Sequence, residues 1–321
     1  MKRSTLVWII IASALFLIGA IVFMQALFMI DFDFSKLSTV HYETRTYEVN
    51  ESFRNISIST ITADVEFVHS EDGNCKVVCL EEEKVVHSVE VKDDTLLIAV
   101  NDKREWYDNI SIFSFRSPKI TVYLPDSEYG SLLIDGRTGD VLIPSGFSFK
   151  EVDISATTGD VRCFSGASGA LGIEVTTGDI KLEDISAAAV SLSVSTGDIR
   201  ATNIKCEGDV SISVRTGDAK ISDVTCKNLN SDGSTGDIIL NGVISSEKIN
   251  VTRSTGDVRF KDSDASEIFI KVSTGDVEGT LLSEKIFIAS TSTGSVKVPQ
   301  SVSGGRCEIK TSTGDIRISI P

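Results

Sequence analysis

The chain has 321 residues, of which 41% are hydrophobic and 24% charged, with 31 basic against 46 acidic side chains and a formal net charge of -15. Such a composition can fold, which excludes wholesale disorder. It also argues against nucleic acid as a partner, because contacts to a phosphate backbone need a basic face and Lys/Arg clusters are missing from the sequence.

An apolar segment near the N-terminus predicts a membrane helix. Residues 6–30 carry no charge, and a helix of that length can cross the ~30 Å hydrocarbon layer. Lys2 and Arg3 precede it, so the positive-inside rule places residues 1–5 in the cytoplasm and residues 31–321 outside. A secretory signal peptide would have a shorter apolar region and a small-x-small cleavage site. We therefore expect an uncleaved, single-pass anchor in the cell membrane, followed by a polar linker over 31–52.

A repeat organises the second half of the chain. The tripeptide Thr-Gly-Asp recurs every 19 or 20 residues, and a further copy, Thr293-Gly294-Ser295, keeps the spacing without the acid. This period is one turn of a solenoid. Glycine suits a tight corner because it adopts positive φ without a Cβ clash. The predicted corner glycines are Gly139, Gly159, Gly178, Gly197, Gly217, Gly236, Gly256, Gly275, Gly294 and Gly314.

Around each corner the apolar residues alternate with period two, which is typical of strands with one buried face. Leu132, Ile134 and Val141 mark the three apolar positions of the first repeat, and equivalent positions refill in nearly every later one. One repeat cannot bury its own apolar face, so the coils must stack at about 4.8 Å. The predicted fold is all-β: a parallel β-helix (β-solenoid) of 19–20-residue coils over 131–321, preceded by one transmembrane helix.

The segment 53–130 is less regular. Ala63-Asp64-Val65 reproduces the corner with alanine in the glycine place, and Ala63 lies 76 residues before Gly139, or four periods of 19. This spacing predicts that the solenoid begins near Phe53 and continues through divergent coils, as expected for the capping end of a repeat protein. The strands assigned to those coils are Val89–Val91, Leu96–Ile98 and Lys119–Leu124.

The Ser/Thr-Thr-Gly-Asp-Val/Ile repeats from Thr138 to Ile316, together with Ala63-Asp64-Val65, resemble the bacterial putative-adhesin family of β-strand-repeat proteins, a domain of unknown function. Within that family the chain is similar to the membrane-anchored, LiaG-like envelope proteins. The resemblance covers most of 53–321. It implies a solenoid displayed in the cell envelope, and it carries over no catalytic residues.

The acids of the repeat form a predicted column. Stacked carboxylates ~5 Å apart repel by about 1 kcal/mol each in water, so something must relieve them. Calcium is one candidate, because Gly-Asp turns bind it in other β-rolls. The column comprises Asp140, Asp160, Asp179, Asp198, Asp218, Asp237, Asp257, Asp276 and Asp315.

A second explanation is a ladder of charges. A cation follows two residues after most of these positions, on the same outward face, whereas a calcium site needs further oxygens that one Asp per turn does not supply. We therefore favour a structural ladder and expect neither a metal nor any other cofactor. The cations are Arg162, Lys181, Arg200, Lys220, Arg259, Lys297 and Arg317.

Catalysis is not expected. Solenoid enzymes that cleave acidic polysaccharides raise carboxylates and Arg or Lys on loops around a cleft, but the glycine spacing from 139 to 314 leaves no room for such a loop. No nucleophile, zinc-protease or phosphate-loop motif is present. The only histidines, His41, His69 and His87, lie in the first third of the chain. A polysaccharide-processing enzyme remains a remote alternative.

The cysteines are expected to be small buried hydrophobes rather than disulfides. Cys75 and Cys79 would lie about 13 Å apart on one strand, and Cys206 and Cys226 would be stacked neighbours at a marginal distance. The aromatic segment 106–115 is expected to pack within a divergent coil, or alternatively to form a membrane-proximal or partner-binding loop.

These features predict a non-enzymatic, membrane-anchored, extracytoplasmic β-solenoid that serves as a surface binding or scaffold module. The coil of Gly314 would leave an unpaired strand edge unless Pro321 or a partner blunts it. The expected partner is an envelope protein or a second copy of the chain, bound through residues 295–321. An accessory regulator of an envelope-stress or sensory membrane complex is the alternative.

Overall fold

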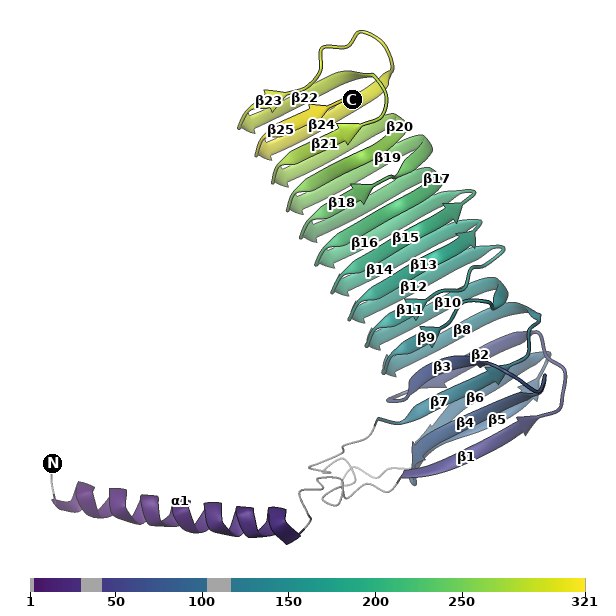
Figure 1. Cartoon of the computed structure of the whole chain (residues 1–321), viewed down its shortest axis with the longest axis vertical. Coiled ribbons are helices and arrows are strands. Elements are labelled where there is room, and N and C mark those ends of the chain that lie inside the picture. Colours follow the sequence, from purple (N-terminus) through teal and green to yellow (C-terminus); the bar gives the residue numbers. More distant parts are fainter. Residues whose placement is uncertain (1–2, 30–41, 103–116, 321) are drawn as a thin grey trace.

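The computed structural model describes residues 3–29, 42–102 and 117–320, and the aromatic segment 106–115 lies outside them (Figure 1). In the described residues that follow helix α1 (Arg3–Met29), the regular elements are strands alone. The helix's stretch Trp8–Gln25 has a mean hydropathy of 2.3, so α1 is long and apolar enough to cross a membrane.

Seven strands form the N-terminal part of the solenoid, which contains its first coils and the cap that closes them. They are β1 (Tyr42–Val49), β2 (Asn55–Thr60), β3 (Asp64–His69), β4 (Cys75–Glu82), β5 (Val85–Lys92), β6 (Thr95–Asp102) and β7 (Lys119–Leu124).

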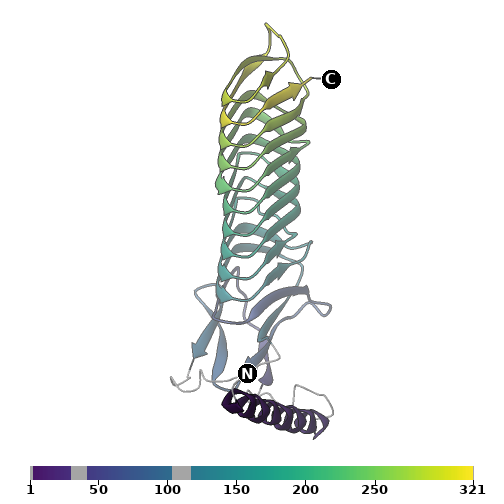
Figure 2. The same cartoon turned by 90° about the vertical axis from the view of Figure 1, so that its left-hand side faces the viewer.

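The regular part contains the remaining strands, stacked as successive rungs of a rod in both views (Figures 1 and 2). They are β8 (Glu128–Thr138), β9 (Val141–Ile143), β10 (Ser148–Thr158), β11 (Val161–Cys163), β12 (Ala170–Thr177), β13 (Ile180–Ala187), β14 (Ala189–Thr196), β15 (Ile199–Cys206), β16 (Asp209–Thr216), β17 (Ala219–Thr235), β18 (Ile238–Asn241), β19 (Ile244–Thr255), β20 (Val258–Thr274), β21 (Val277–Leu281), β22 (Lys285–Thr293), β23 (Val296–Lys297), β24 (Gly305–Thr313) and β25 (Ile316–Ser319).

The predicted β-solenoid is confirmed. Each strand of the regular part pairs in parallel with the equivalent strand one coil away, and the predicted columns keep their register: Leu132 lies opposite Val152, and Val161 opposite Ile180. The columns are buried, as at Ile154 and Ile212 with no exposed surface. Full burial of such a side chain contributes roughly 1.5–3 kcal/mol, and because each rung reuses the same columns the core runs the length of the rod.

The N-terminal coils differ from the prediction. The coil of Ala63 (β2 and β3) stacks directly on the coil of Gly139, because Ile56 pairs with Leu132 and Val65 with Val141. No coil lies between them, so the interval of 76 residues does not represent four stacked turns. On the other side of β2 and β3 lie β6 and β7, which together make a single parallel rung.

Strands β4 and β5 close this end and, together with β1, form the cap. They run antiparallel to β7 and β6 respectively, so Val89–Val91 of β5 belongs to a cap and not to a coil. Residues 42–49, expected in a linker, form β1, which pairs antiparallel with β4. Antiparallel capping strands interrupt the coil geometry at this end.

The C-terminal end also departs from chain order. Strand β24 inserts between β20 and β22, because Cys307 pairs with Ile268 on one side and with Phe287 on the other. The rung of Gly294 is therefore outermost and the rung of Gly314 lies beneath it. The prediction that the last coil in sequence leaves the open edge is wrong: the open edge is β22.

Candidate functional site

The corner aspartates form one continuous hydrogen-bonded ladder. The Oδ1 atom of each Asp accepts a hydrogen bond from the backbone N–H of the corner residue in the next rung outward, at 2.7–3.0 Å. The order of acceptors is Asp64, Asp140, Asp160, Asp179, Asp198, Asp218, Asp237, Asp257, Asp276 and Asp315. Backbone N–H groups of the neighbouring rung thus relieve the stacked carboxylates, in addition to the predicted cations.

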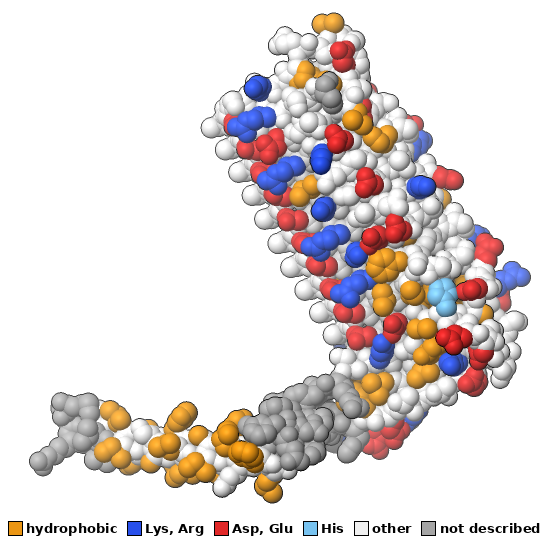
Figure 3. Space-filling model, in the orientation of Figure 1, with side chains coloured by type: hydrophobic (Ala, Val, Ile, Leu, Met, Phe, Trp, Pro, Cys, Tyr) orange, Lys and Arg blue, Asp and Glu red, His pale blue; other side chains and the backbone are white. Residues whose placement is uncertain are grey.

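Several predicted cations use the other carboxylate oxygen. Arg200 bridges Asp179 at 3.2 Å and Asp198 at 2.9 Å, and Arg259 likewise bridges two rungs of the column. Red and blue side chains accordingly alternate along one edge of the rod (Figure 3). Lys181 instead pairs with Glu183 of its own strand. These pairs are half exposed, so each contributes about 0–1 kcal/mol.

Two carboxylates of the column, Asp237 and Asp315, have lowered pKa values because of these contacts. Burial acts to raise the pKa of Asp237, but the backbone N–H of Asp257 and the guanidinium of Arg259 outweigh it, so that pKa lies below its usual value. The backbone N–H and hydroxyl of Ser295 lower the pKa of Asp315. Both shifts favour the ionised forms of Asp237 and Asp315, and the calcium column stays a prediction.

The ladder has an end. Ser295 occupies the corner of the outermost rung, where its N–H and hydroxyl both donate to Asp315. Ser295 has no carboxylate to accept the N–H of a further rung. The rearranged chain order thus places the rung without an acid at the end of the stack, where an acid would face solvent.

A second corner was missed by the sequence analysis. Six residues after the corner glycines, Asp184, Asn203, Asp223 and Asp262 have φ of 50–58° and Gly242 has φ of 59°. Asp, Asn and Gly are the residues that tolerate this left-handed conformation. The recurrence of Asp, Asn or Gly at this position of the repeat is visible in the sequence and could have predicted the second corner.

The open edge strand β22 is uncharged beyond its first residue and apolar in its first half. Residues 286–293 carry no ionisable side chain, and Ile286 and Ile288 are 45% and 47% exposed. Lys285, which precedes them, is buried against Asp264 at 2.6 Å. Edge strands are usually blunted by Lys, Pro or a bulge; β22 has none of these beyond its first residue, so it is suited to strand addition.

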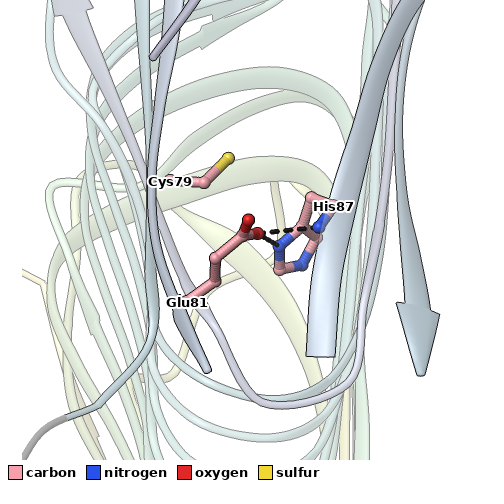
Figure 4. A group of neighbouring side chains, drawn as sticks. All are labelled: Cys79, Glu81 and His87. Carbon is pink, nitrogen blue, oxygen red and sulfur yellow. Dashed lines mark hydrogen bonds and ion pairs between the residues drawn. The ribbon is translucent and has the colours of Figure 1, made fainter. Parts of the chain in front are cut away.

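The cap holds a cluster of a different kind, made by Cys79 and Glu81 of β4 and His87 of β5 (Figure 4). Glu81 Oε2 accepts hydrogen bonds from the backbone N–H of His87 at 2.7 Å and from its Nδ1 at 2.9 Å. Burial raises the pKa of the Cys79 thiol to about 12. Within the described ranges this is the group of three side chains close enough to share one metal ion.

All six cysteines are free and buried, which confirms the reading of small hydrophobes over disulfides. Burial raises the pKa of Cys226 to about 12 and that of Cys163 to about 11. These thiols are protonated at neutral pH and belong to the core.

The Toastrack DUF4097 family matches this chain over residues 53–213 and 205–321, which together span the whole solenoid. The chain belongs to this family. The predicted resemblance to a putative-adhesin family of β-repeat proteins is confirmed by this Toastrack match.

Solved structures are similar to this Toastrack chain at low identity. A putative adhesin of Bacteroides fragilis is 19% identical with a TM-score of 0.48, covering 87% of this chain and 97% of its own. A putative adhesin of Parabacteroides distasonis is 13% identical with a TM-score of 0.48, covering 87% and 98%. A putative lipid-binding protein of the same organism is 16% identical with a TM-score of 0.42, covering 88% and 98%. No curated protein matches the chain.

His69 fastens the first Toastrack coil to its neighbour. Its Nδ1 lies 2.7 Å from Asp126 Oδ1 and its Nε2 2.8 Å from the carbonyl oxygen of Ser145, and its ring stacks on Phe147. Both partners only accept, so both ring nitrogens carry hydrogen in this arrangement. The Ser145 carbonyl and then the Asp126 carboxylate raise the pKa of His69.

This contact predicts a pH-dependent contribution to stability. Because the folded pKa lies above the unfolded value of about 6.5, the contribution is complete below pH ~6.5 and is lost as the pH rises through the folded pKa. The ring is half exposed, so we expect less than about 1 kcal/mol. Thermal unfolding between pH 5 and 8 should show this loss in the native chain and a flatter profile in His69→Gln; identical profiles would contradict the assignment.

Proposed function

We propose that this Toastrack chain is a non-enzymatic, membrane-anchored, extracytoplasmic β-solenoid that acts as a surface binding or scaffold module. The observation that carries the proposal is strand β22, which is uncharged from Ile286 to Thr293 and paired on one side only, by β24, at the outer end of a rod whose rungs are in register. A rod of this kind can hold a partner by strand addition, in which main-chain hydrogen bonds supply affinity and alternate side chains supply specificity.

The position of α1 supports anchoring. Only residues 30–41 separate Met29 from Tyr42 of β1, and an extended chain covers at most about 3.5 Å per residue. With α1 in a bilayer, the cap would stay within about 40 Å of the membrane and β22 would point to the far end of the rod. The positive residues before α1 favour a cytoplasmic N-terminus.

Crosslinking of the full-length protein in its native membrane tests the binding role. We expect capture through β22, of a second copy or of an envelope protein. We expect the double variant Ile286→Lys/Ile288→Lys to reduce capture at least tenfold, because charged side chains, Lys above all, protect an edge strand against the addition of another strand. Leu133→Lys is the matched control, since Leu133 is also 45% exposed but lies on β8, which is paired on both sides.

Equal capture by the edge variant and the native chain would overturn the edge proposal. Deletion of 295–321 is not a clean test, because it also removes β24 and uncovers β20 as a new edge.

The short connection between α1 and β1 also favours a second function, accessory regulation of a membrane complex. In that case the captured partner is an integral-membrane protein, and its capture fails when Leu6–Ile30 is replaced by an unrelated anchor.

A further inference from the structure

The cap contains three side chains whose chemistry is that of a zinc site and whose convergence the solenoid core does not require. The donor atoms of Cys79, Glu81 and His87 lie within 4.8 Å of one another. All three residues are buried, with exposed fractions of 0%, 0% and 4%. Thiolate, carboxylate and imidazole are the three protein ligands of Zn²⁺.

The cluster lies between β4 and β5, which share little backbone pairing. Strands β4 and β5 continue different sides of the solenoid, and they pair with each other only at Glu82 and Val85, beside the turn. Beyond that point Glu81 reaches across to His87, and the Tyr47 hydroxyl of β1 donates to the His87 carbonyl oxygen at 2.9 Å. Side chains therefore hold this end closed.

We propose that Cys79, Glu81 and His87 bind one Zn²⁺ ion that clips β4 to β5 and closes the cap. Zinc ligands lie about 2.0–2.3 Å from the ion and hence about 3.3–3.8 Å from one another. The Cys79 sulfur must therefore approach the other two donor atoms by up to about 1 Å, whereas His87 Nδ1 and Glu81 Oε2, which lie 2.9 Å apart, must separate slightly. Side-chain rotation suffices for such a movement, because the ligands come from facing strands and point toward one another (Figure 4).

The surrounding contacts allow each ligand to turn to the metal. Glu81 Oε1 accepts no hydrogen bond; its charged neighbour is Arg45 Nη1 at 3.2 Å. Arg45 is 37% exposed and also bonds Glu43 at 3.0 Å, so it retains a partner when Glu81 turns away. The metal charge then replaces that of the guanidinium beside the buried carboxylate.

His87 can present its Nδ1 lone pair in the other neutral tautomer. Its Nε2 lies 3.4 Å from Thr60 Oγ1, which can accept the Nε2 hydrogen while Nδ1 bonds the ion. The Cys79 thiol loses its proton to solvent as the sulfur–zinc bond forms, so one proton is released per ion. A buried Glu–His pair alone would account for Glu81 and His87; Cys79, a core side chain in the column of Cys75 and Val77, adds the third donor atom within reach of the same ion.

Cobalt substitution tests the site in the full-length chain purified in detergent. Co²⁺ is the probe, because a thiolate ligand gives it a charge-transfer absorption that oxygen and nitrogen ligands do not. We expect one Co²⁺ per chain with this band, displacement by Zn²⁺, loss of the band in Cys79→Ser, and at least 100-fold weaker binding in His87→Gln. Cys307→Ser, a buried cysteine at the far end of the rod, is the control and should keep the band.

Absence of the band in the native chain would overturn the proposal, as would a band that survives in Cys79→Ser or an unchanged Co²⁺ affinity in His87→Gln. Circular dichroism confirms that each variant keeps its β structure. If Cys79→Ser fails to fold, His87→Gln decides, since that variant keeps the thiol.

Discussion

Replacement of Gly256 by alanine should lower the free energy of unfolding of the solenoid by about 3 kcal/mol or more. Gly256 has φ of 134°, a region that side-chain-bearing residues rarely adopt. A Cβ atom there would lie 1.9 Å from the carbonyl oxygen of Gly236 in the rung below. That oxygen belongs to the backbone and cannot rotate away, so the two rungs would have to separate and break their ladder.

Gly172 supplies the matched control within the same solenoid. It lies on β12 without a positive φ, and an added Cβ would meet nothing nearer than Asp153 Oδ1 at 3.7 Å. Gly172→Ala should therefore change the free energy of unfolding by less than about 0.5 kcal/mol. Urea unfolding of both variants measures the difference; similar midpoints would show that the corner does not need glycine.

The first coil does not require glycine at its corner, where Ala63 stands. This alanine has no positive φ, and the rung stacked on its other side is β6–β7, which lacks a Thr-Gly-Asp corner. The alanine was visible in the sequence as a departure from the repeat. Its meaning, a corner of different geometry at the boundary between cap and solenoid, required the pairing of the strands.

The regular coils were predictable because each rung has the same surroundings. Period-two alternation specifies which side chains face inward, and the glycine at constant spacing specifies where the chain turns. Ile154 and Ile212 could be assigned to the core without knowing which coil lies above or below them. Local pattern and global fold agree over this region.

The order of the coils at both ends was not predictable, because the rungs resemble one another. Rungs with identical columns are interchangeable as neighbours, so the repeat does not encode which rung stacks on which. Only the loss of the acid at Ser295 distinguishes the outermost rung, and the sequence alone offered no reason to read that loss as an end.

The cap cluster is hidden for another reason. Cys79, Glu81 and His87 belong to antiparallel strands outside the repeat, so no spacing rule relates them. One signal existed: Glu81 stands in the inward column of Cys75, Val77 and Cys79, where a carboxylate is costly unless it is paired. Its partner on β5 could not be read from the sequence.

Arg253 is a cation buried in the core, and its replacement by methionine should raise the free energy of unfolding by about 1–4 kcal/mol. It is 1% exposed and occupies a column where Val214 and Val272 stand in nearby rungs. Its Nη1 donates to the Val214 carbonyl oxygen at 2.7 Å, but its Nε and Nη2 have no hydrogen-bond partner. Burial lowers the pKa of Arg253, which shows that the site disfavours the charge.

The space for this side chain comes from Gly233, whose added Cβ would meet Arg253 Nη1. Methionine is unbranched and flexible, so it can fill the same channel without the unpaired N–H groups. The loss of one hydrogen bond to Val214 costs about 1 kcal/mol, less than the desolvation that the variant removes.

Arg200→Met is the control, and its expected change in the free energy of unfolding has the opposite sign. Arg200 is half exposed and bridges two column aspartates, so its removal should lower the free energy of unfolding by no more than about 1 kcal/mol. Denaturant unfolding of both variants separates the two cases. A destabilised Arg253→Met chain would contradict the argument, because it would mean that the buried guanidinium is fully paired and that the Gly233–Arg253 combination strengthens the core instead of weakening it.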